Sequence, residues 1–227
     1  LILKNLMKLK NTFQKNTNLM LLEKFQEEKI KLNWMALSTG SRKIKTAVFI
    51  SGAGSNLKSI IKFSKIKKSP ISVNLIISNN PKSKGLFLGK IFKIKKEIIN
   101  FKRKKLAEKK ILFELKKNKI ELVCLAGFMK ILSKNFINNF KGKIINIHPS
   151  LLPKFKGLNT HYRVIENKER YSGCTVHFVS SKLDSGKIIL QKKIKINKNE
   201  TPKTLAKKIL VQEHKLYPMA ILKIFNL

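Results

Sequence analysis

Acidic residues are scarce in this chain of 227 residues, which holds 12 Asp and Glu against 50 Lys and Arg and has a formal net charge of +38. That charge balance favours contact with polyanions. Arginine, which reads bases and phosphates through its planar fork, is also scarce, and it occurs only at Arg42, Arg103, Arg163 and Arg170. The lysines are spread along the whole chain, so we predict no specific nucleic-acid partner.

Cysteine and long apolar runs are scarce as well. Cys124 and Cys174 are the two cysteines, and neither they nor the four histidines show the spacing of metal ligands, so we expect reduced thiols and no metal. No apolar run approaches the roughly 20 residues that span a bilayer. The sequence therefore predicts a cytoplasmic protein without a membrane partner, and we expect either a monomer or a homodimer.

The chain divides at about residue 43 by composition. Residues 1–43 are rich in Lys, Asn and Leu and end in a Ser- and Gly-containing stretch, so we predict an irregular extension outside the core. Hydrophobic residues make up 43% of the whole chain, which is enough for a packed core. We predict one domain over residues 44–227.

Short apolar runs alternate with helical patterns in the first part of this domain. The expected strands cover residues 46–50, 73–78, 91–94, 122–126 and 144–147, and helices are expected over 55–64, 102–118, the segment up to 140, and from Thr201-Pro202 onward. Alternating runs at 174–179 and 188–196 indicate antiparallel strands. The pattern predicts an α/β fold with a doubly wound, mostly parallel sheet, helices on both faces, and antiparallel strands added in the C-terminal half.

A glycine-containing turn follows the first expected strand and opens the first helix. Its sequence, Ser51-Gly52-Ala53-Gly54-Ser55-Asn56, lacks the third glycine of a dinucleotide fingerprint and the lysine of a Walker loop. A helix start with free N–H groups favours an anion such as phosphate. The alternative interpretation is a tight turn in which Ser55 or Asn56 only caps the helix.

Three polar residues further along the chain form a candidate catalytic group. Asn146 and His148 lie two apart on an expected strand and so project to one face, near the edge where parallel sheets place their ligands. An Asn amide can stabilise a developing oxyanion, and a His can transfer protons near neutral pH. Asp184 is the only Asp in the chain and would favour a charged His148, although an Asp before Ser-Gly is usually a turn former. His177 is interpreted as a core histidine.

Several motifs together resemble the phosphoribosylglycinamide formyltransferases, folate-dependent enzymes of purine synthesis. In chain order these are Ser51-Gly52-x-Gly54-Ser55-Asn56-Leu57, Leu125-Ala126-Gly127-Phe128-Met129-Lys130-Ile131-Leu132, Asn146-x-His148-Pro149-Ser150-Leu151-Leu152-Pro153, Gly157-Leu158-x-Thr160-His161, Thr175-Val176-His177-Phe178-Val179, Leu183-Asp184-x-Gly186 and Glu213-His214-x-x-Tyr217-Pro218. The resemblance implies that the amine of 5-phosphoribosylglycinamide attacks the formyl group of the co-substrate 10-formyltetrahydrofolate through a tetrahedral intermediate. That reaction belongs to de novo purine (IMP) biosynthesis.

The resemblance also implies a role for each matching residue. Asn146 would bind the formyl oxygen, His148 would donate a proton and Asp184 would keep His148 charged. The substrate phosphate would bind Gly54, Ser55 and Asn56, and Glu213, a carboxylate on an otherwise apolar helix face, would bind the ribose or amine end. The folate-binding residues would be Lys104, Met129, Lys130, Ile131, Leu132 and Asn146.

The chain departs from the family pattern at a few positions. Ala53 replaces a larger residue, Asn159 stands where relatives often have His, Leu210 replaces a residue that is polar in some relatives, and Arg103 is as close as Lys104 to the expected basic folate contact. Two related activities stay open as alternatives. Methionyl-tRNA formyltransferases normally carry a further C-terminal β domain, and formyltetrahydrofolate hydrolases an N-terminal regulatory domain.

Overall fold

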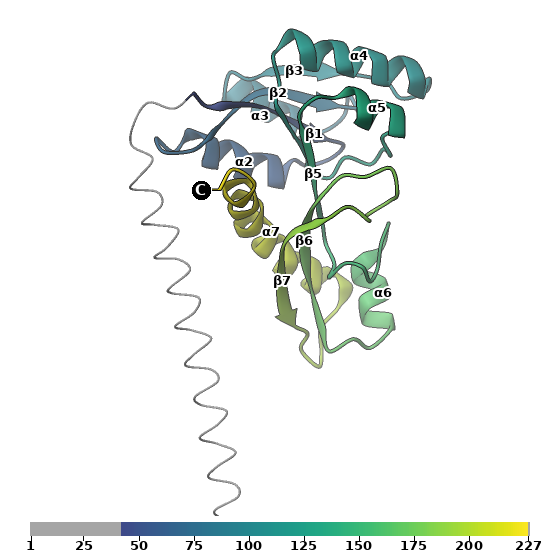
Figure 1. Ribbon diagram of the computed structural model, residues 1–227. Helices are drawn as coiled ribbons and strands as arrows, with labels where there is room; N and C mark the ends of the chain where they lie inside the picture. The colour runs from purple at the N-terminus through teal and green to yellow at the C-terminus, as the bar shows by residue number, and fades with distance from the viewer. Residues whose placement is uncertain (1–41, 227) are drawn as a thin grey trace, which may run out of the picture. The chain divides into compact units, whose positions relative to one another are not determined.

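Seven strands form a single sheet in the order β3-β2-β1-β4-β5-β6-β7 (Figure 1). Their bounds are β1 (Ile44–Ile50), β2 (Ile71–Ser78), β3 (Lys95–Ile98), β4 (Leu122–Leu125), β5 (Lys143–His148), β6 (Tyr171–Phe178) and β7 (Ile188–Lys195). The computed structural model describes residues 42–226, and the expected extension therefore lies, apart from its last two residues, outside the described residues.

Strands β1 to β5 are parallel to one another, whereas β6 pairs antiparallel with both β5 and β7. This arrangement confirms the predicted fold class. Because the carboxyl ends of parallel strands lie at one edge of a sheet, the loops after β1, β2, β4 and β5 meet there. The strand order reverses direction at β1, which is the point where open α/β sheets leave a crevice for ligands.

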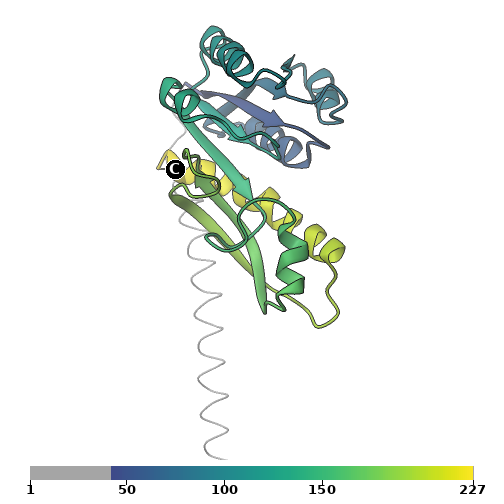
Figure 2. The same cartoon turned by 90° about the vertical axis from the view of Figure 1, so that its right-hand side faces the viewer.

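Helices cover both faces of the sheet (Figures 1 and 2). Their bounds are α2 (Ser55–Lys65), α3 (Leu86–Ile91), α4 (Lys104–Lys117), α5 (Lys134–Asn139), α6 (Thr160–Glu166) and α7 (Pro202–Ile224). Phe49, Ile111 and Phe136 belong to one buried apolar cluster that joins the sheet to α4 and α5. The opposite face is covered by α2 and α7, which pack on each other. Within residues 42–226, no helix is long and apolar enough to cross a membrane.

A capping pair defines the start of the final helix, and a polar contact joins its middle to α2. Thr201 caps its first turn, as predicted, and forms a reciprocal pair of hydrogen bonds with Thr204. Pro218 lies inside the helix and has no N–H for the carbonyl of His214, which instead accepts a 2.8 Å hydrogen bond from the Ser59 hydroxyl on α2. The turn that carries Glu213 is thereby attached to α2.

Two expectations about element positions were wrong. A strand was expected at 91–94, but β3 covers Lys95–Ile98, because this edge strand exposes Lys95 and Lys96 and so lacks the apolar signature. The segment after β4 was expected to be helical up to residue 140, yet α5 starts only at Lys134, where the Ser133 hydroxyl accepts from the Phe136 amide. Residues 126–133 therefore form a loop at the ligand edge, and the short helices α3 and α6 were missed altogether.

Candidate active site

Three predicted catalytic residues come together at the carboxyl end of β5. Asn146 and His148 project from β5, and Asp184 lies in the turn between β6 and β7 with φ of 44°. His148 Nδ1 lies 3.3 Å from Asp184 Oδ2, and Asn146 Nδ2 lies 3.5 Å from Asp184 Oδ1. His148 and Asp184 are 5% and 9% exposed, so their mutual attraction is screened little by solvent.

The two ring nitrogens of His148 both face acceptors. Nε2 lies 2.8 Å from the carbonyl oxygen of Phe155, and Nδ1 faces the carboxylate of Asp184. A carbonyl can only accept, so Nε2 must carry a hydrogen, and an ionised Asp184 also requires a hydrogen on Nδ1. Both ring nitrogens are therefore engaged, Nε2 with the backbone and Nδ1 with Asp184.

A fourth residue, His177, joins this group. Its Nδ1 donates to the Phe178 carbonyl over 2.8 Å, and its Nε2 lies 3.3 Å from Asn146 Nδ2. Burial lowers the pKa of His177, which favours the neutral ring with a lone pair on Nε2. The Asn146 amide then donates one hydrogen to His177. Its second hydrogen faces Asp184 Oδ1 over 3.5 Å, a long hydrogen bond.

His177 was expected to be a core histidine with a satisfied hydrogen bond. It is buried and satisfied, but its Nε2 also contacts the Asn146 amide. The signal that reveals this contact is the register of β5 and β6, in which Asn146 pairs directly with His177. That register joins segments 31 residues apart in the sequence, so local periodicity did not contain it.

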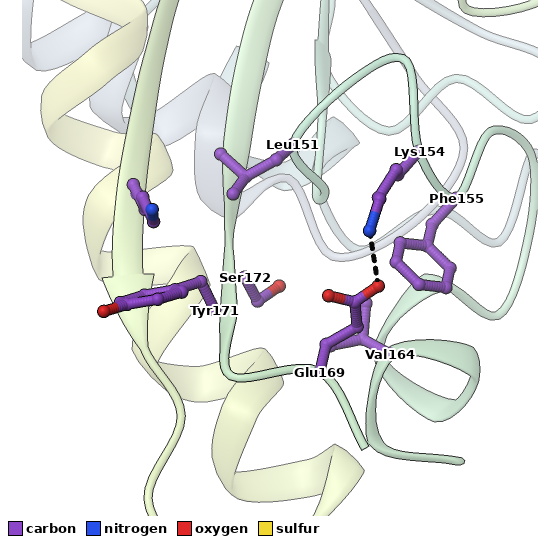
Figure 3. A pocket seen from close by; sticks show the side chains of 8 residues that line it. Leu151, Lys154, Phe155, Val164, Glu169, Tyr171 and Ser172 are labelled. Carbon is purple, nitrogen blue, oxygen red and sulfur yellow. Dashed lines mark hydrogen bonds and ion pairs between the residues drawn. The ribbon is translucent and has the colours of Figure 1, made fainter. Parts of the chain in front are cut away.

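The loop after β5 supplies the carbonyl that binds His148. Several contacts hold this loop in place, and Figure 3 shows the one between Lys154 and Glu169. Lys154 forms a 2.8 Å ion pair with Glu169, and the Ser150 hydroxyl donates to the Lys154 carbonyl over 2.7 Å. The Phe155 ring lines a cavity of about 220 Å³ beside Val164. On its other side the loop is attached to the Asp184 turn, because the Gly157 amide donates to Asp184 Oδ2 over 2.9 Å. Asp184 therefore fixes both His148 and the loop above it.

The predicted anion cradle lies at the end of β1. Gly54 is the N-cap of α2 with φ of 77°, and no side chain caps the helix, so the first-turn amides of Ser55 and Asn56 have no capping acceptor. The alternative that Ser55 or Asn56 acts as a capping side chain is therefore wrong. A Cβ at Gly54 would lie 2.7 Å from the Cα of Gly85, so only glycine fits this close approach.

Glu213 and Asn56 meet at the start of α2. Glu213 is 6% exposed, and its Oε2 accepts a 2.7 Å hydrogen bond from Asn56 Nδ2. Burial raises the pKa of Glu213, and the hydrogen bond from Asn56 opposes that rise. Asn56 Oδ1 is buried and has no hydrogen-bond partner among the described residues. Two acceptors, Oδ1 of Asn56 and the carboxylate, thus suit a ligand that brings hydroxyl or amine donors.

The predicted folate-binding residues lie on two neighbouring segments. Met129 and Ile131 are 63% and 58% exposed in the loop after β4, whereas Leu132 is 4% exposed and packs in the core, so its side chain is not on the surface. Lys104 is the first residue of α4, and its Nζ lies 4.0 Å from Glu108. The Glu108 carboxylate also accepts 2.7 and 2.6 Å hydrogen bonds from the amide and hydroxyl of Ser133, which places the start of α4 beside this loop.

Two basic residues, Arg103 and Lys104, lie at the start of α4. Arg103 lines a cavity of about 450 Å³ together with Lys102 and Lys110, whereas Lys104 does not line it. Ile98 and Leu106 are among the apolar residues that line this cavity. Among residues 42–226, no cluster of three or more His, Cys, Asp or Glu has a metal-binding arrangement.

Residues 44–221 match the family described as formyl transferase. The chain therefore belongs to the formyl transferase family. It is 36% identical over 177 residues to the phosphoribosylglycinamide formyltransferase of Escherichia coli (strain K12), covering 77% of this chain and 84% of that protein. The crystal structure of phosphoribosylglycinamide formyltransferase from Anaplasma phagocytophilum is 38% identical, with a TM-score of 0.75 over 79% of this chain and 85% of that chain. Within the family, the chain thus belongs with the phosphoribosylglycinamide formyltransferases.

Longer proteins contain a similar segment. The chain is 37% identical over 209 residues to the human trifunctional purine biosynthetic protein adenosine-3, covering 86% of this chain. It spans 20% of that relative's length.

Proposed function

We propose that this chain transfers the formyl group of 10-formyltetrahydrofolate to the amine of 5-phosphoribosylglycinamide. The observation that carries the proposal is the buried group of Asn146, His148 and Asp184, whose polar atoms approach within 3.5 Å at the ligand edge of the sheet. This group combines an amide donor, an imidazole that can transfer a proton, and a carboxylate that faces the imidazole. Such a group suits acyl transfer without a covalent enzyme intermediate.

In the proposed reaction the glycinamide nitrogen attacks the formyl carbon, and a tetrahedral intermediate with a negatively charged oxygen forms. The Nδ2 hydrogen of Asn146 that faces Asp184 Oδ1 over 3.5 Å would turn to donate to this oxygen. Collapse of the intermediate breaks the bond between the formyl carbon and N10 of the folate. The N10 atom takes up a proton from His148, and the proton lost by the amine restores the ring. The products are the formylated ribonucleotide and tetrahydrofolate.

The remaining residues would bind the two substrates. The amides of Gly54, Ser55 and Asn56 suit a phosphate, because the helix start is uncapped and favours an anion. Glu213 and the unpaired Asn56 Oδ1 suit the hydroxyl or amine donors that follow the phosphate. The exposed apolar side chains of Met129 and Ile131 suit the folate ring system, with Lys130 and the Leu132 backbone beside them.

The basic residues at the start of α4 suit the folate's carboxylates. Lys104 was the predicted contact, and Arg103 is a second candidate because it lines the adjacent cavity. We infer that the transferring unit comprises residues 44–227, since the family match covers 44–221 and α7 continues to Ile224. A cytoplasmic location and the monomeric or homodimeric state stay predictions.

The test is an absorbance assay that follows tetrahydrofolate release from 10-formyltetrahydrofolate in three parallel reactions. One contains 5-phosphoribosylglycinamide, one contains charged initiator tRNA and one contains no acceptor. The proposal expects release only with the ribonucleotide. Release with tRNA would identify a tRNA formyltransferase, and release without an acceptor would identify a hydrolase, so either result would overturn the proposal.

A further inference from the structure

We propose that the Ser51 hydroxyl is a positioning group that couples binding of the phosphorylated substrate to binding of the folate. Ser51 is the first residue after β1, where it opens the anion cradle. Its Oγ accepts a 2.8 Å hydrogen bond from the amide of Met129, the first residue of the proposed folate loop. One side chain thus joins the two proposed subsites, and this inference rests on the proposed function.

The hydroxyl of Ser51 has its remaining hydrogen engaged as well. It donates to Oδ1 of Asn79, which follows β2, over 2.5 Å. A serine hydroxyl has a single hydrogen, so this donation directs a lone pair of Oγ at the Met129 amide. The contact with Met129 is therefore oriented from a third loop and does not depend on free rotation of the hydroxyl.

The other side of the cradle is already fixed. The Ser51 carbonyl accepts from Asn80 Nδ2 over 3.1 Å, and the Gly52 carbonyl accepts from the Ser83 hydroxyl over 2.6 Å and from the Gly85 amide over 3.1 Å. These contacts come from the loop after β2. With that side fixed, the connection from the cradle to the folate loop runs through Ser51.

Two hydrogen bonds make that connection. The Ser51 amide donates to the Gly127 carbonyl over 3.1 Å, and Ser51 Oγ accepts from Met129. Removal of the hydroxyl would leave the backbone bond to Gly127 and the fold of the cradle in place. It would remove the acceptor of the Met129 amide together with the donor to Asn79 Oδ1 that orients it. Ser51→Ala therefore isolates the side-chain contribution.

Positive coupling follows from this shared contact. A phosphate bound to the cradle amides restricts the loop that begins at Ser51, and through Oγ it also restricts Met129. The folate then binds a loop that is already ordered, and the ordering cost is met once for both ligands. Linkage requires that each ligand tightens the other by the same factor.

The experiment measures this factor directly by calorimetry. Tetrahydrofolate and 5-phosphoribosylglycinamide form a non-reacting pair because neither carries a formyl group. The Kd of tetrahydrofolate is measured with and without saturating ribonucleotide, in the wild type, in Ser51→Ala and in a control, Ser59→Ala. Ser59 loses a hydroxyl that donates to the His214 carbonyl on α7 and contacts neither loop.

We expect the ribonucleotide to tighten tetrahydrofolate about fivefold or more in the wild type and in Ser59→Ala. In Ser51→Ala the ratio should fall to within about twofold of unity, with each single-ligand Kd changed less than the ratio. A wild-type ratio of one, or an unchanged ratio in Ser51→Ala, would overturn the coupling. Failure of both ligands to bind the wild type would instead overturn the proposed function.

A second measurement needs no variant. Hydrogen exchange of the peptide that contains Met129 is followed with the ribonucleotide alone. The coupling requires slower exchange at the Met129 amide although the ribonucleotide does not occupy the folate subsite. Unchanged exchange there, together with slowed exchange at Ser55 and Asn56, would contradict the proposal.

Discussion

Asp184→Asn tests the charge in the candidate active site with little change in shape. Asp184 Oδ2 lies 3.3 Å from His148 Nδ1 and also accepts from the Gly157 amide over 2.9 Å. Asn is isosteric with Asp and tolerates positive φ, and Asp184 has φ of 44°, so the turn should persist. The substitution therefore removes the carboxylate charge while the amide oxygen can still bind Gly157.

The magnitude follows from the distance. Two unit charges 3.3 Å apart attract by about 5 kcal/mol at an effective dielectric constant of about 20. Breaking one partner of a buried pair typically costs about 3–5 kcal/mol. If His148 must carry its charge through the reaction, Asp184→Asn should lower kcat by roughly 10² to several times 10³, at about 1.4 kcal/mol per tenfold.

The assay is steady-state formyl transfer with both substrates saturating, and Ser185→Ala serves as the control. Ser185 lies in the same turn and is exposed, and its hydroxyl contacts the Leu183 carbonyl and Lys156 rather than His148. Asp184→Asn should lower kcat far more than it raises either KM, and it should change the pH–rate profile. A loss below about tenfold in a folded variant with an unchanged profile would refute the reasoning.

Three further predictions concern the neighbouring residues. His177→Leu removes the acceptor that orients the Asn146 amide, so kcat should fall roughly tenfold while both KM values stay within about twofold. An unchanged kcat would show that His177 is only structural. Burial raises the pKa of Glu213, so the native state binds the carboxyl proton more tightly than the unfolded chain does. The stability that the protonated carboxyl contributes is therefore lost as pH rises from about 4.3 through the raised pKa. Glu213→Gln should therefore have a higher Tm than the wild type at pH 7 and a smaller difference near pH 4, with a raised KM for the ribonucleotide only; equal Tm differences at both pH values would contradict this. Tyr217→Phe removes a buried hydroxyl that lies 2.9 and 3.2 Å from the carbonyl oxygens of Leu125 and Ile145. This loss should lower the free energy of unfolding, measured by urea titration, by about 1–3 kcal/mol without changing KM. An unchanged unfolding midpoint would show that the two carbonyls need no donor.

The sequence predicted those parts of the fold that depend on local pattern. Continuous apolar runs located β1, β2, β4 and β5, and the Thr201-Pro202 pair located the start of α7. Edge strand β3 escaped this reasoning because three of its four residues are charged and its position depends on pairing with β2. Helix α6 is short and starts after Asn159, which adopts positive φ without a side-chain cap, so it lacked the usual start signal.

The candidate site was predictable where side-chain chemistry carries it. The two-residue spacing of Asn146 and His148 placed both at the same strand end, and the solitary Asp184 drew attention by composition. The contacts that complete the site are of another kind. The Phe155 carbonyl is a backbone group, and the pairings of His177 with Asn146 and of Ser51 with Met129 join distant segments. Such contacts follow from strand register and loop closure, which periodicity does not encode.

The most direct test of the proposed transfer follows the formyl carbon itself. The full chain is supplied with 10-formyltetrahydrofolate labelled at the formyl carbon and with 5-phosphoribosylglycinamide, and both products are quantified in the same sample. The account predicts one labelled formyl group on the ribonucleotide for each tetrahydrofolate released, and loss of both products together in Asn146→Ala. Release of tetrahydrofolate with the label recovered as free formate would contradict it.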